Sequence, residues 1–451
     1  MLRTMSSGVE LKRPRPDTRE KEAQATQSDL GENDRTVNSP LSRPTPRRSY
    51  AADRWLAGQL LTGLGGPPVR IVLPDGEEVA VSSAPPVARV VIEDRATLWK
   101  LALRPMLEFG EAYTARRLDV EGNLVDLLVA VYQMGGSVQT GSFLTRYAAY
   151  LQYWLDSNTL SRSKKHIHHH YDIGNDFYQL WLDEELVYTC AYFPTPSTGL
   201  EAAQRAKMDL VCRKLWLRPG ETVVEAGCGW GAMALHMARY YGVSVRAFNI
   251  SHEQIAYARR KAEALGLTSR VEFVEDDYRN VSGHCDAFVS VGMLEHVGPN
   301  HYHELGQTID RALSPTGRGL IHSIGQNHGG RALNPWIRRR IFPGAYPPAL
   351  REMAALLEPW GFTVCDVENL RLHYAQTLWH WLARFEAAEE RVREMFDPAF
   401  VRMWRLYLAG SRAAFLAGEL QLFQVVFARP QTNEVPWTRA VLYQSLQPAG
   451  A

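Results

Sequence analysis

Apolar and polar residues follow two different periods along the second half of the chain. From Tyr171 onward, short apolar runs predict buried strands at residues 222–225, 244–250, 271–274, 287–291 and 319–324. Between them, apolar residues recur at helical spacing at residues 233–241, 253–265, 301–313 and 348–360. Two more helical windows, 375–396 and 398–416, lead into a last β run at 420–427. Strands that alternate with helices indicate a parallel, doubly wound sheet, so we expect an α/β, Rossmann-like fold.

The first part of the chain has shorter elements. Residues 69–73, 79–81 and 87–92 are β-prone, and Pro74-Asp75-Gly76 predicts a turn between the first two runs. Helical windows follow at residues 96–109 and 124–133. We therefore expect a small α+β domain at residues 51–155, a larger domain at 160–430 and a tail at 431–451. Residues 1–50 have few large apolar side chains to offset the entropy of ordering, so we expect a disordered leader.

Composition excludes several classes of protein. The formal net charge of the 451 residues is +1, which lacks the basic excess of a nucleic-acid binder. An odd number of cysteines with no CxxC pair argues against a disulfide framework or a cysteine-rich zinc site: Cys190, Cys212, Cys228, Cys285 and Cys365. No signal-peptide pattern and no run of about 18 apolar residues is present. We expect a cytoplasmic protein that meets lipid from the inner membrane surface, and a homodimer stays open.

A glycine-rich turn follows the first strand of the larger domain. The segment Glu225-Ala-Gly-Cys-Gly-Trp-Gly231 joins this strand to a helix and brings Gly227, Cys228 and Gly229 to the carboxyl edge of the sheet. Doubly wound folds bind nucleotides at that edge, where glycine lets the backbone approach a ligand closely. The segment also satisfies GxGxxA, a dinucleotide fingerprint, so NAD and S-adenosylmethionine both remain candidates.

Three features favour S-adenosylmethionine. Glu225 stands where a carboxylate can face the ammonium group of this cofactor, although it could also only stabilise the turn. Asn249 and Gln254 offer neutral polar groups to a ribose, without the acidic residue that NAD requires; a helix-capping role with Ser251 is an equal alternative. Asp277 and Tyr278 follow the third strand and could read adenine, although Tyr278 could also be part of the core.

Taken with other motifs, this loop resembles the cyclopropane-fatty-acyl-phospholipid synthase family, which includes the mycolic-acid cyclopropane synthases. The matching segments lie in collinear order between residues 165 and 430: 170–178 (HYDIGNDFY), 188–193 (YTCAYF), the GCGWG loop, 291–298 (VGMLEHVG), 321–325 (IHSIG), 335–336, 341–343 (IFP), 373–374 and 377–378. The preceding domain is similar to the small, lipid-binding-like N-terminal domain of the members that act on phospholipids. The resemblance implies a class I S-adenosylmethionine-dependent methyltransferase fold.

The resemblance also implies a reaction and a set of site residues. The reaction is methylene transfer from S-adenosylmethionine to a cis alkene of a phospholipid acyl chain, with a bound bicarbonate ion as the base. Cofactor contacts carried over from the family fall on Tyr188, Thr189, Gly227, Asn249, Gln254 and Tyr278. The implied bicarbonate ligands are Cys190, Glu295, His322, the backbone of Ile324, and Tyr374.

Some of these positions depart from the family or have simpler interpretations. Asn249 and Thr189 stand where threonine and serine are usual, and both keep hydrogen-bonding capacity. Cys190 could be a small buried hydrophobic residue, and His322 a satisfied core histidine. Glu295 could cap a helix. The histidines at 166 and 168–170 lie in one short basic linker without a carboxylate, so we expect no metal site there.

The implied chemistry makes specific demands on the pocket. An alkene is a weak nucleophile, and holding it in line with the sulfonium methyl group can supply about 7 to 11 kcal/mol of the barrier. The resulting carbocation must be kept from water, and aromatic faces stabilise a cation without attacking it. Candidates are Tyr171, Tyr178, Phe193 and Tyr374. A base must then remove a proton from the added methyl group.

One segment suggests contact with a membrane surface. Residues 336–342 interleave aromatic side chains with Arg338, Arg339 and Arg340, as an interfacial segment facing anionic headgroups does. Together with Arg162, Lys164 and Lys165 they could form a basic rim, although a solvated helix face explains them equally well. Three functional alternatives stay open: a related methyltransferase that leaves a methyl branch or modifies a small amine, a lipid-binding protein without activity, and an NAD oxidoreductase.

Overall fold

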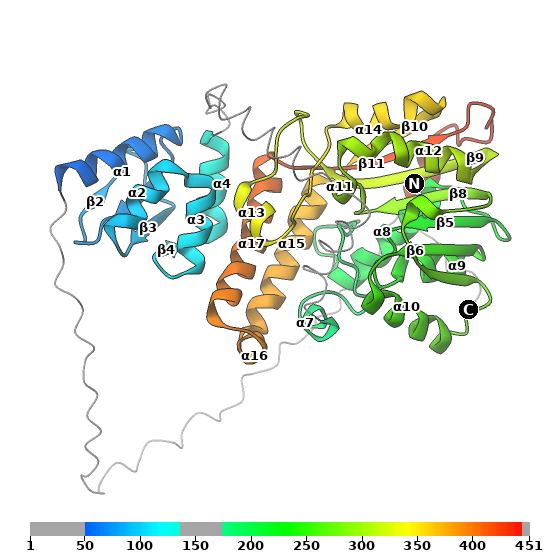
Figure 1. The fold of residues 1–451 in the computed structure, drawn as a ribbon, viewed down its shortest axis with the longest axis horizontal. Helices are drawn as coiled ribbons and strands as arrows, with labels where there is room; N and C mark the ends of the chain where they lie inside the picture. The colour runs from blue at the N-terminus through cyan, green and yellow to red at the C-terminus, as the bar shows by residue number, and fades with distance from the viewer. Residues whose placement is uncertain (1–49, 136–173, 444–451) are drawn as a thin grey trace, which may run out of the picture. The chain divides into compact units, whose positions relative to one another are not determined.

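The computed structural model describes residues 50–135 and 174–443 (Figure 1). Several expectations lie outside the described residues: the leader at 1–49, the end of the N-terminal domain at 136–155, the basic linker with its histidine cluster, and Tyr171. Residues 444–451 of the tail also lie outside them. In the described ranges, no helix combines the length and the apolar character that crossing a membrane requires.

A seven-stranded sheet forms the centre of the larger domain, with its strands in the order β10-β11-β9-β8-β5-β6-β7. The strands are β5 (Thr222–Ala226), β6 (Ser244–Asn249), β7 (Val271–Glu275), β8 (Cys285–Val291), β9 (Leu313–Gly325), β10 (Thr363–Asn369) and β11 (Gln421–Ala428). The neighbouring strands from β9 to β7 are parallel, whereas β11 runs antiparallel to both β9 and β10. The α/β class predicted from the alternating pattern is confirmed.

Helices cover both faces of this sheet because its strands are apolar on both faces; in β11 all eight residues are buried. One apolar layer packs α8, α9 and α10 against the sheet, and a second layer packs α12 and α14 against it. The helices of this domain are α7 (Asn175–Gln179), α8 (Leu200–Lys214), α9 (Ala232–Tyr241), α10 (His252–Ala264), α11 (Leu294–Val297), α12 (Tyr302–Ala312), α13 (Pro335–Arg340), α14 (Leu350–Leu357), α15 (Arg371–Ala387), α16 (Glu389–Met395), α17 (Pro398–Ala417) and α18 (Ala440–Tyr443). Three 3-10 turns, η1 (Tyr278–Asn280), η2 (Pro299–His301) and η3 (Glu358–Trp360), complete it.

The described elements of this domain differ from the sequence expectation in several places, and the short helices α7, α11, α13 and α18 were not predicted. The window at 375–396 is two helices, α15 and α16, which meet at Ala388. Strand β9 begins at Leu313, earlier than the predicted run at 319–324. Strand β10 was not predicted, because an edge strand with mostly part-exposed residues has no continuous apolar run. Helix α8 was not predicted either, and it contributes to the site described below.

Residues 50–135, called the N-terminal domain below, belong to the same compact unit as the larger domain and have their own four-stranded sheet in the order β2-β1-β3-β4. Its elements are α1 (Ala51–Gly63), β1 (Val69–Val72), β2 (Glu78–Val79), β3 (Ala88–Ile92), α2 (Arg95–Leu103), α3 (Pro105–Thr114), β4 (Leu118–Gly122) and α4 (Leu124–Gly135). The single helix expected at 96–109 is divided at Arg104, because Pro105 starts a new helix at its first position. The sequence did not predict α1 and β4.

Candidate active site

The glycine loop between β5 and α9 has the backbone shape that a ligand-binding turn requires. Gly227 has φ +83°, and a Cβ atom there would lie 2.9 Å from the Cβ of Met293. Gly229 has φ +54°, and no heavy atom lies within 4 Å of the position its Cβ would take. Gly227 and Cys228 donate backbone hydrogen bonds to the carbonyl of Phe248, at 2.9 and 3.0 Å. Only glycine fits at Gly227, and the space at Gly229 is open to a ligand.

Glu225 is a buried carboxylate at the end of β5, with 2% of its surface exposed. Burial raises its pKa to about 8, while the charge of Lys207 and a hydrogen bond from the backbone of Ala234 act in the opposite direction. Its Oε2 atom has no hydrogen-bond partner among the described residues. A buried, unsatisfied carboxylate oxygen beside a glycine loop fits an ammonium group of a ligand.

At the end of β6, two amide side chains are locked together. Asn249 Nδ2 donates to Gln254 Oε1 at 2.7 Å and to the carbonyl of Gly229 at 3.2 Å. The hydroxyl of Ser251 caps α10 by accepting from the backbone of Gln254, so the capping role considered for Ser251 is present. The side chain of Gln254, however, contacts Asn249. Both amides thus lie next to the glycine loop.

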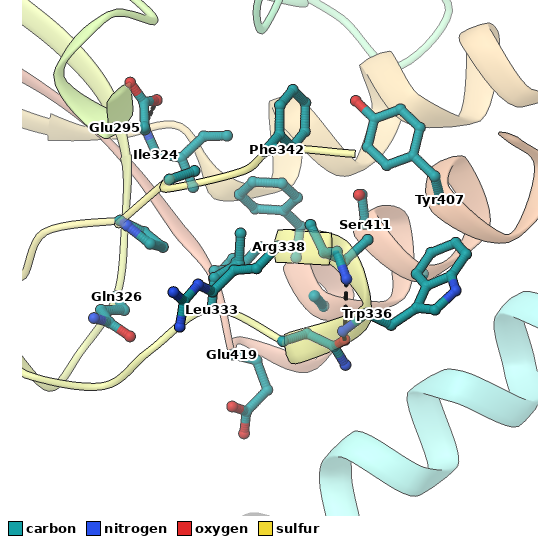
Figure 2. Close-up of a pocket in the computed structure, with 18 of the residues that line it drawn as sticks. Glu295, Ile324, Gln326, Leu333, Trp336, Arg338, Phe342, Tyr407, Ser411 and Glu419 are labelled. Atoms are coloured by element: carbon teal, nitrogen blue, oxygen red, sulfur yellow. Dashed lines mark hydrogen bonds between the residues drawn. The ribbon is translucent and has the colours of Figure 1, made fainter. Parts of the chain in front are cut away.

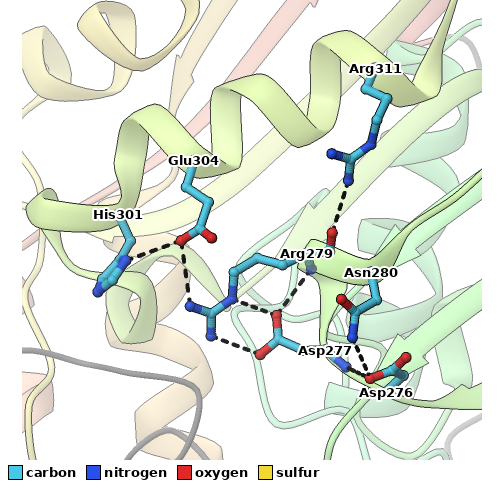
Figure 3. Close-up of polar contacts among 7 residues, drawn as sticks. All are labelled: Asp276, Asp277, Arg279, Asn280, His301, Glu304 and Arg311. Atoms are coloured by element: carbon cyan, nitrogen blue, oxygen red, sulfur yellow. Dashed lines mark hydrogen bonds and ion pairs between the residues drawn. The ribbon is translucent and has the colours of Figure 1, made fainter.

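After β7, Asp277 binds the side chain of Arg279 through both carboxylate oxygens, with distances of 2.8 Å to Nε and 2.9 Å to Nη2 (Figure 3). Glu304 on α12 contacts the same guanidinium at 3.5 Å and accepts a hydrogen bond from the ring of His301 at 3.1 Å. This network fixes the η1 turn that carries Tyr278, whose pKa is raised by burial so that its phenol stays neutral. Contact of Asp277 and Tyr278 with adenine stays a prediction.

A cavity of about 400 Å³ is lined by the turn after β8 and by α13, α15 and α17, and the described residues of the three loops above do not line it (Figure 2). Its lining includes five of the residues predicted for the site: Tyr188, Thr189, Glu295, Ile324 and Tyr374. Apolar side chains of the larger domain form much of the wall: Leu333, Trp336, Phe342, Leu378, Leu406 and Phe415. The N-terminal domain contributes Met106, Phe109, Leu128 and Tyr132. A cavity with these walls suits an extended apolar ligand.

Glu295 is the main acid of this cavity and lies on the short helix α11, directly after β8. Its Oε1 atom accepts a hydrogen bond from the backbone N–H of Ile324 at 2.5 Å, and its Oε2 atom has no partner among the described residues. Burial raises the pKa of Glu295 to about 7, partly opposed by that hydrogen bond. The carboxyl group can therefore exchange a proton near neutral pH. The Ile324 N–H is already used in holding Glu295.

His322 lies on β9 in register with the end of β8 and is 1% exposed. Its Nδ1 atom lies 3.1 Å from the side-chain nitrogen of Gln424, and its Nε2 atom has no partner among the described residues. Burial, with Lys207 and Lys214 nearby, holds its pKa well below the ordinary value, so the ring is neutral. Because Gln424 donates to Nδ1, the proton of the neutral ring belongs on Nε2.

Cys190 and Tyr374 differ in their relation to the cavity. Cys190 is completely buried, its thiol lies 3.2 Å from the carbonyl of Ala191, and burial raises its pKa, so it stays protonated. Neither Cys190 nor His322 lines the cavity. Tyr374 does line it, and its ring centroid lies 4.6 Å from that of Phe415.

The aromatic residues nearest the cavity are partly different from those expected. Tyr178 and Phe193 do not line it: Tyr178 is buried against Trp181, and Phe193 stacks on His380. Phe342 and Tyr407 do line it, and the Tyr407 hydroxyl lies 2.7 Å from that of Tyr188. Figure 2 shows both rings at the cavity. Spacing within a segment cannot reveal such residues, because Phe342 lies in the loop after α13 and Tyr407 on α17, far apart in sequence.

The segment at 335–342 is less exposed than a membrane-facing segment requires. Asn334 caps α13, and Trp336 is only 3% exposed against Gly110. Arg340 forms an ion pair with Glu111 at 2.5 Å, and the Arg339 side chain, which is 62% exposed, lies 3.8 Å from the same carboxylate. The expectation that the aromatic residues here face a membrane is therefore wrong for Trp336, and the exposed charge is centred on Arg339.

Sequence reasoning missed Lys207 on α8. Its side chain is 1% exposed, and its ammonium group donates to the hydroxyl of Thr189 at 3.0 Å. One turn earlier, Gln204 donates to the carbonyls of Val187 and Thr189. The available signal was a polar pair, Gln204 and Lys207, on the apolar side of an amphipathic helix, since Ala203 and Leu210 beside them are buried.

Comparison with known proteins shows which family the chain belongs to. The family described as mycolic acid cyclopropane synthetase matches residues 158–425, more than half of the chain. The chain belongs to the mycolic acid cyclopropane synthetase family. The family resemblance found in the sequence is thus confirmed. The chain is an S-adenosylmethionine-dependent methyltransferase with the class I fold. A domain family of unknown function matches residues 57–143.

Relatives within and around this family show how far the likeness extends. A probable fatty acid methyltransferase of Pseudomonas putida is 33% identical over 84% of this chain and 96% of its own length. The cyclopropane-fatty-acyl-phospholipid synthase of Escherichia coli K12 is 40% identical over 58% of this chain and 68% of its own. The Mycobacterium tuberculosis cyclopropane synthase MmaA2 is 28% identical, covers 60% of this chain and 100% of its own, and superposes with a TM-score of 0.57.

A solved relative in this family also supports the cofactor. The mycolic acid cyclopropane synthase CmaA1, complexed with SAH and CTAB, is 29% identical over 59% of this chain and 98% of its own, with a TM-score of 0.56. As a member of this family, the chain therefore uses S-adenosylmethionine as its cofactor. The expectation of bicarbonate has no such support.

Proposed function

We propose that this family member transfers a methylene group from S-adenosylmethionine to the cis double bond of an unsaturated phospholipid acyl chain, which gives a cyclopropane fatty acid. The observation that carries the proposal is the apolar cavity of about 400 Å³ whose lining includes Thr189, Glu295 and Tyr374. The turn after β8 links the cavity to the cofactor loop: Gly292 lines the cavity, and the next residue, Met293, lies so near Gly227 that a Cβ atom there would be 2.9 Å from the Met293 Cβ. The arrangement can therefore bring an acyl chain next to a sulfonium methyl group.

At the cofactor end, each polar group has a role that fits part of S-adenosylmethionine. Glu225 accepts the ammonium group, Gly229 leaves room for the ligand backbone, and the Asn249–Gln254 pair faces the ribose. The full set proposed to contact the cofactor is Tyr188, Thr189, Glu225, Gly227, Cys228, Gly229, Asn249, Gln254, Asp277 and Tyr278. Support comes from the unsatisfied Glu225 oxygen and the open space at Gly229.

The acyl end must orient the alkene and keep water away. The walls of the cavity are mainly apolar and aromatic, so a bound chain displaces water and holds the double bond in line with the methyl group. In the proposed step, the alkene π electrons form a bond to the methyl carbon, and the sulfonium C–S bond breaks. The positive charge left on the chain then faces the rings of Phe342, Tyr374 and Tyr407.

Ring closure requires loss of a proton from the added methyl group. We propose that a bicarbonate ion, when bound, would be held by the side chains of Cys190, Glu295, His322 and Tyr374, and by the Ile324 N–H once Glu295 releases it. The ion would supply a base that does not trap the cation as a protein ester. The buried Oε2 of Glu295 and Nε2 of His322, both unsatisfied in the described structure, support an additional small polar group here. Glu295, with its pKa near 7, can take the proton onward.

The experiment is a product analysis. The full chain is incubated with S-adenosylmethionine and vesicles of a phospholipid that carries one cis double bond per chain, and the esterified fatty acids are analysed by mass spectrometry and proton NMR. A gain of one CH₂ unit with loss of the olefinic protons supports the proposal. The proposal would be overturned if the protein binds S-adenosylhomocysteine normally and the acyl chains of the lipid are unchanged.

A methyl-branched product is the second candidate. It is favoured by two relatives that match more than three quarters of this chain: the Pseudomonas putida protein above and the tuberculostearic acid methyltransferase UfaA1 of Mycobacterium tuberculosis, 32% identical over 80% of this chain. Both products add one CH₂ unit, so mass alone does not separate them. Olefinic protons that persist or move along the chain would identify the branched product.

We also infer that the chain works at the cytoplasmic surface of a membrane with anionic lipids. The cavity wall includes Arg338, and Arg339, which follows it in the chain, is exposed; Arg331 also lines the wall but pairs with Glu419 at 2.7 Å. Cationic side chains beside an acyl pocket favour approach to anionic headgroups. The arginines belong to a segment whose aromatic residues are directed inward, so the attraction proposed here is electrostatic.

A further inference from the structure

Lys207 is a deeply buried cation, 1% exposed, that the predicted chemistry does not use. Its ammonium group lies 3.0 Å from the hydroxyl of Thr189, and Gln204 binds the carbonyls of Val187 and Thr189 at 3.1 and 2.9 Å. Helix α8 thus uses two polar side chains to hold the segment that brings Tyr188 and Thr189 to the cavity. Burying a charged lysine costs free energy. The neutral side chain of Gln204 already makes two of these three hydrogen bonds, so holding the segment does not by itself require a lysine.

The groups that face Lys207 come from each element packed around it. They are Asp183 from the turn after α7, Thr189 and Cys190 from the cavity segment, Cys212 from α8 itself, Glu225 from β5 and His322 from β9. Of these, Asp183 has its own hydrogen bonds from the backbone of Glu185 and Val187. Glu225 has an unsatisfied oxygen, and Lys207 is the cation that lowers its pKa.

Charge compensation explains why a lysine is needed here. Burial raises the pKa of Glu225 to about 8 even with Lys207 present, and it lowers the pKa of Lys207 to about 8. Without a neighbouring cation, the carboxyl group would hold its proton more tightly still. A protonated carboxyl group cannot form an ion pair with an ammonium group. A ligand that carries an ammonium group would therefore bind more weakly.

We propose that Lys207 is a positioning residue for S-adenosylmethionine: it favours the ionised form of Glu225, the form that pairs with the methionyl ammonium group, and it holds Thr189 at the wall of the cavity. This inference rests on the cofactor contact proposed for Glu225. It does not depend on the identity of the methyl acceptor.

The test measures S-adenosylhomocysteine binding to the full chain by isothermal titration calorimetry between pH 6 and pH 8.5. We expect the wild-type affinity to rise with pH as Glu225 ionises. Lys207→Met should bind at least tenfold more weakly at pH 7 and reach its highest affinity at a higher pH, whereas Lys207→Arg should stay close to wild type. Titration of the ligand amino group is common to all variants and cancels in the comparison.

Lys214→Met is the matched control. Lys214 lies two turns further along α8, is equally buried, and pairs with Glu368 at 2.5 Å, away from the glycine loop. Its loss should lower thermal stability without shifting the pH at which affinity levels off. A folded Lys207→Met variant with wild-type affinity and pH profile would overturn the proposal, as would an equal pH shift in Lys214→Met.

Two further variants keep the proposal testable if Lys207→Met does not fold. Lys207→Gln keeps a donor for Thr189 but removes the charge, so it should reproduce the pH shift; a wild-type profile would contradict the role of the charge. In Glu225→Gln, the proton released on ligand binding at pH 7, measured in buffers of different ionisation enthalpy, should disappear. Unchanged proton release would refute the role of Glu225. Binding of S-adenosylhomocysteine needs no methyl acceptor. This test therefore stays valid even if the protein forms no cyclopropane product.

Discussion

Glu295 has the chemistry of a proton acceptor, since one oxygen is fixed by Ile324 and the other is free within the described structure. Glu295→Gln keeps the shape and a hydrogen-bonding group but cannot take a proton. We expect product formation to fall by about 10²- to 10⁴-fold, the usual contribution of a general base. S-adenosylhomocysteine affinity should stay within about twofold, because Glu295 lies outside the proposed cofactor contacts. Full activity of this variant would refute the assignment.

The pH dependence of the reaction follows from the same residue. Burial raises the pKa of Glu295 to about 7, so the carboxyl group is protonated below pH 7 and ionised above it. If the ionised form accepts the proton, kcat should rise as pH increases through about 7 and then level off. The measurement is kcat at saturating S-adenosylmethionine and lipid from pH 5.5 to 8.5. A rate that falls over this range would mean that the protonated carboxyl group is the active form.

At the scale of single elements, the β5–α9 loop offers a matched pair of substitutions. Gly227 and Gly229 both have positive φ, so alanine costs about 1 to 2 kcal/mol at either position. Only at Gly227 would the new Cβ also meet Met293, at 2.9 Å. Gly227→Ala should therefore lower the melting temperature more than Gly229→Ala does, and both should weaken S-adenosylhomocysteine binding. Equal melting temperatures with unchanged binding would contradict the role of the loop.

Some elements could be predicted from the sequence and others could not, for identifiable physical reasons. Strands such as β5 and β8 were predicted because they are buried on both faces and read as apolar runs. Strand β10 was missed because an edge strand exposes most of its side chains, and the division of α15 from α16 at Ala388 has no proline or glycine to mark it. The sequence also placed Glu295 and Tyr374, but only through their motifs. Contacts between distant helices, such as Tyr188 with Tyr407, leave no local pattern.

Membrane binding concerns the surface of the whole molecule. Arg338, Arg339 and Arg340 form the last turn of α13, and Glu111 pairs more closely with Arg340, at 2.5 Å, than with the more exposed Arg339, at 3.8 Å. Arg339→Ala should therefore weaken binding to vesicles that contain anionic lipid more than Arg340→Ala does, and high salt should remove the difference. Co-sedimentation with anionic and neutral vesicles measures both effects. Equal binding of the two variants and the wild type would exclude this segment from the membrane contact.

The N-terminal domain takes part in the cavity, and this separates the chain from a catalytic domain alone. MmaA2 matches over its full length with only 60% of this chain, whereas Met106, Phe109, Leu128 and Tyr132 complete the wall here. Leu128→Trp should occupy part of the acyl space and lower kcat/KM for long-chain phospholipid by at least tenfold without changing S-adenosylhomocysteine affinity. Gln133→Trp, at an exposed position of the same helix, is the control.

The comparison of the two tryptophan variants decides what the N-terminal domain does. If both reduce the rate equally, the domain acts through its surface or its fold, and the wall contributes nothing specific. If Leu128→Trp alone is impaired, and a shorter unsaturated chain restores part of its kcat/KM, the domain limits the length of chain that the cavity accepts. A filled cavity must penalise long chains most, because the volume removed by the indole is volume that only they need.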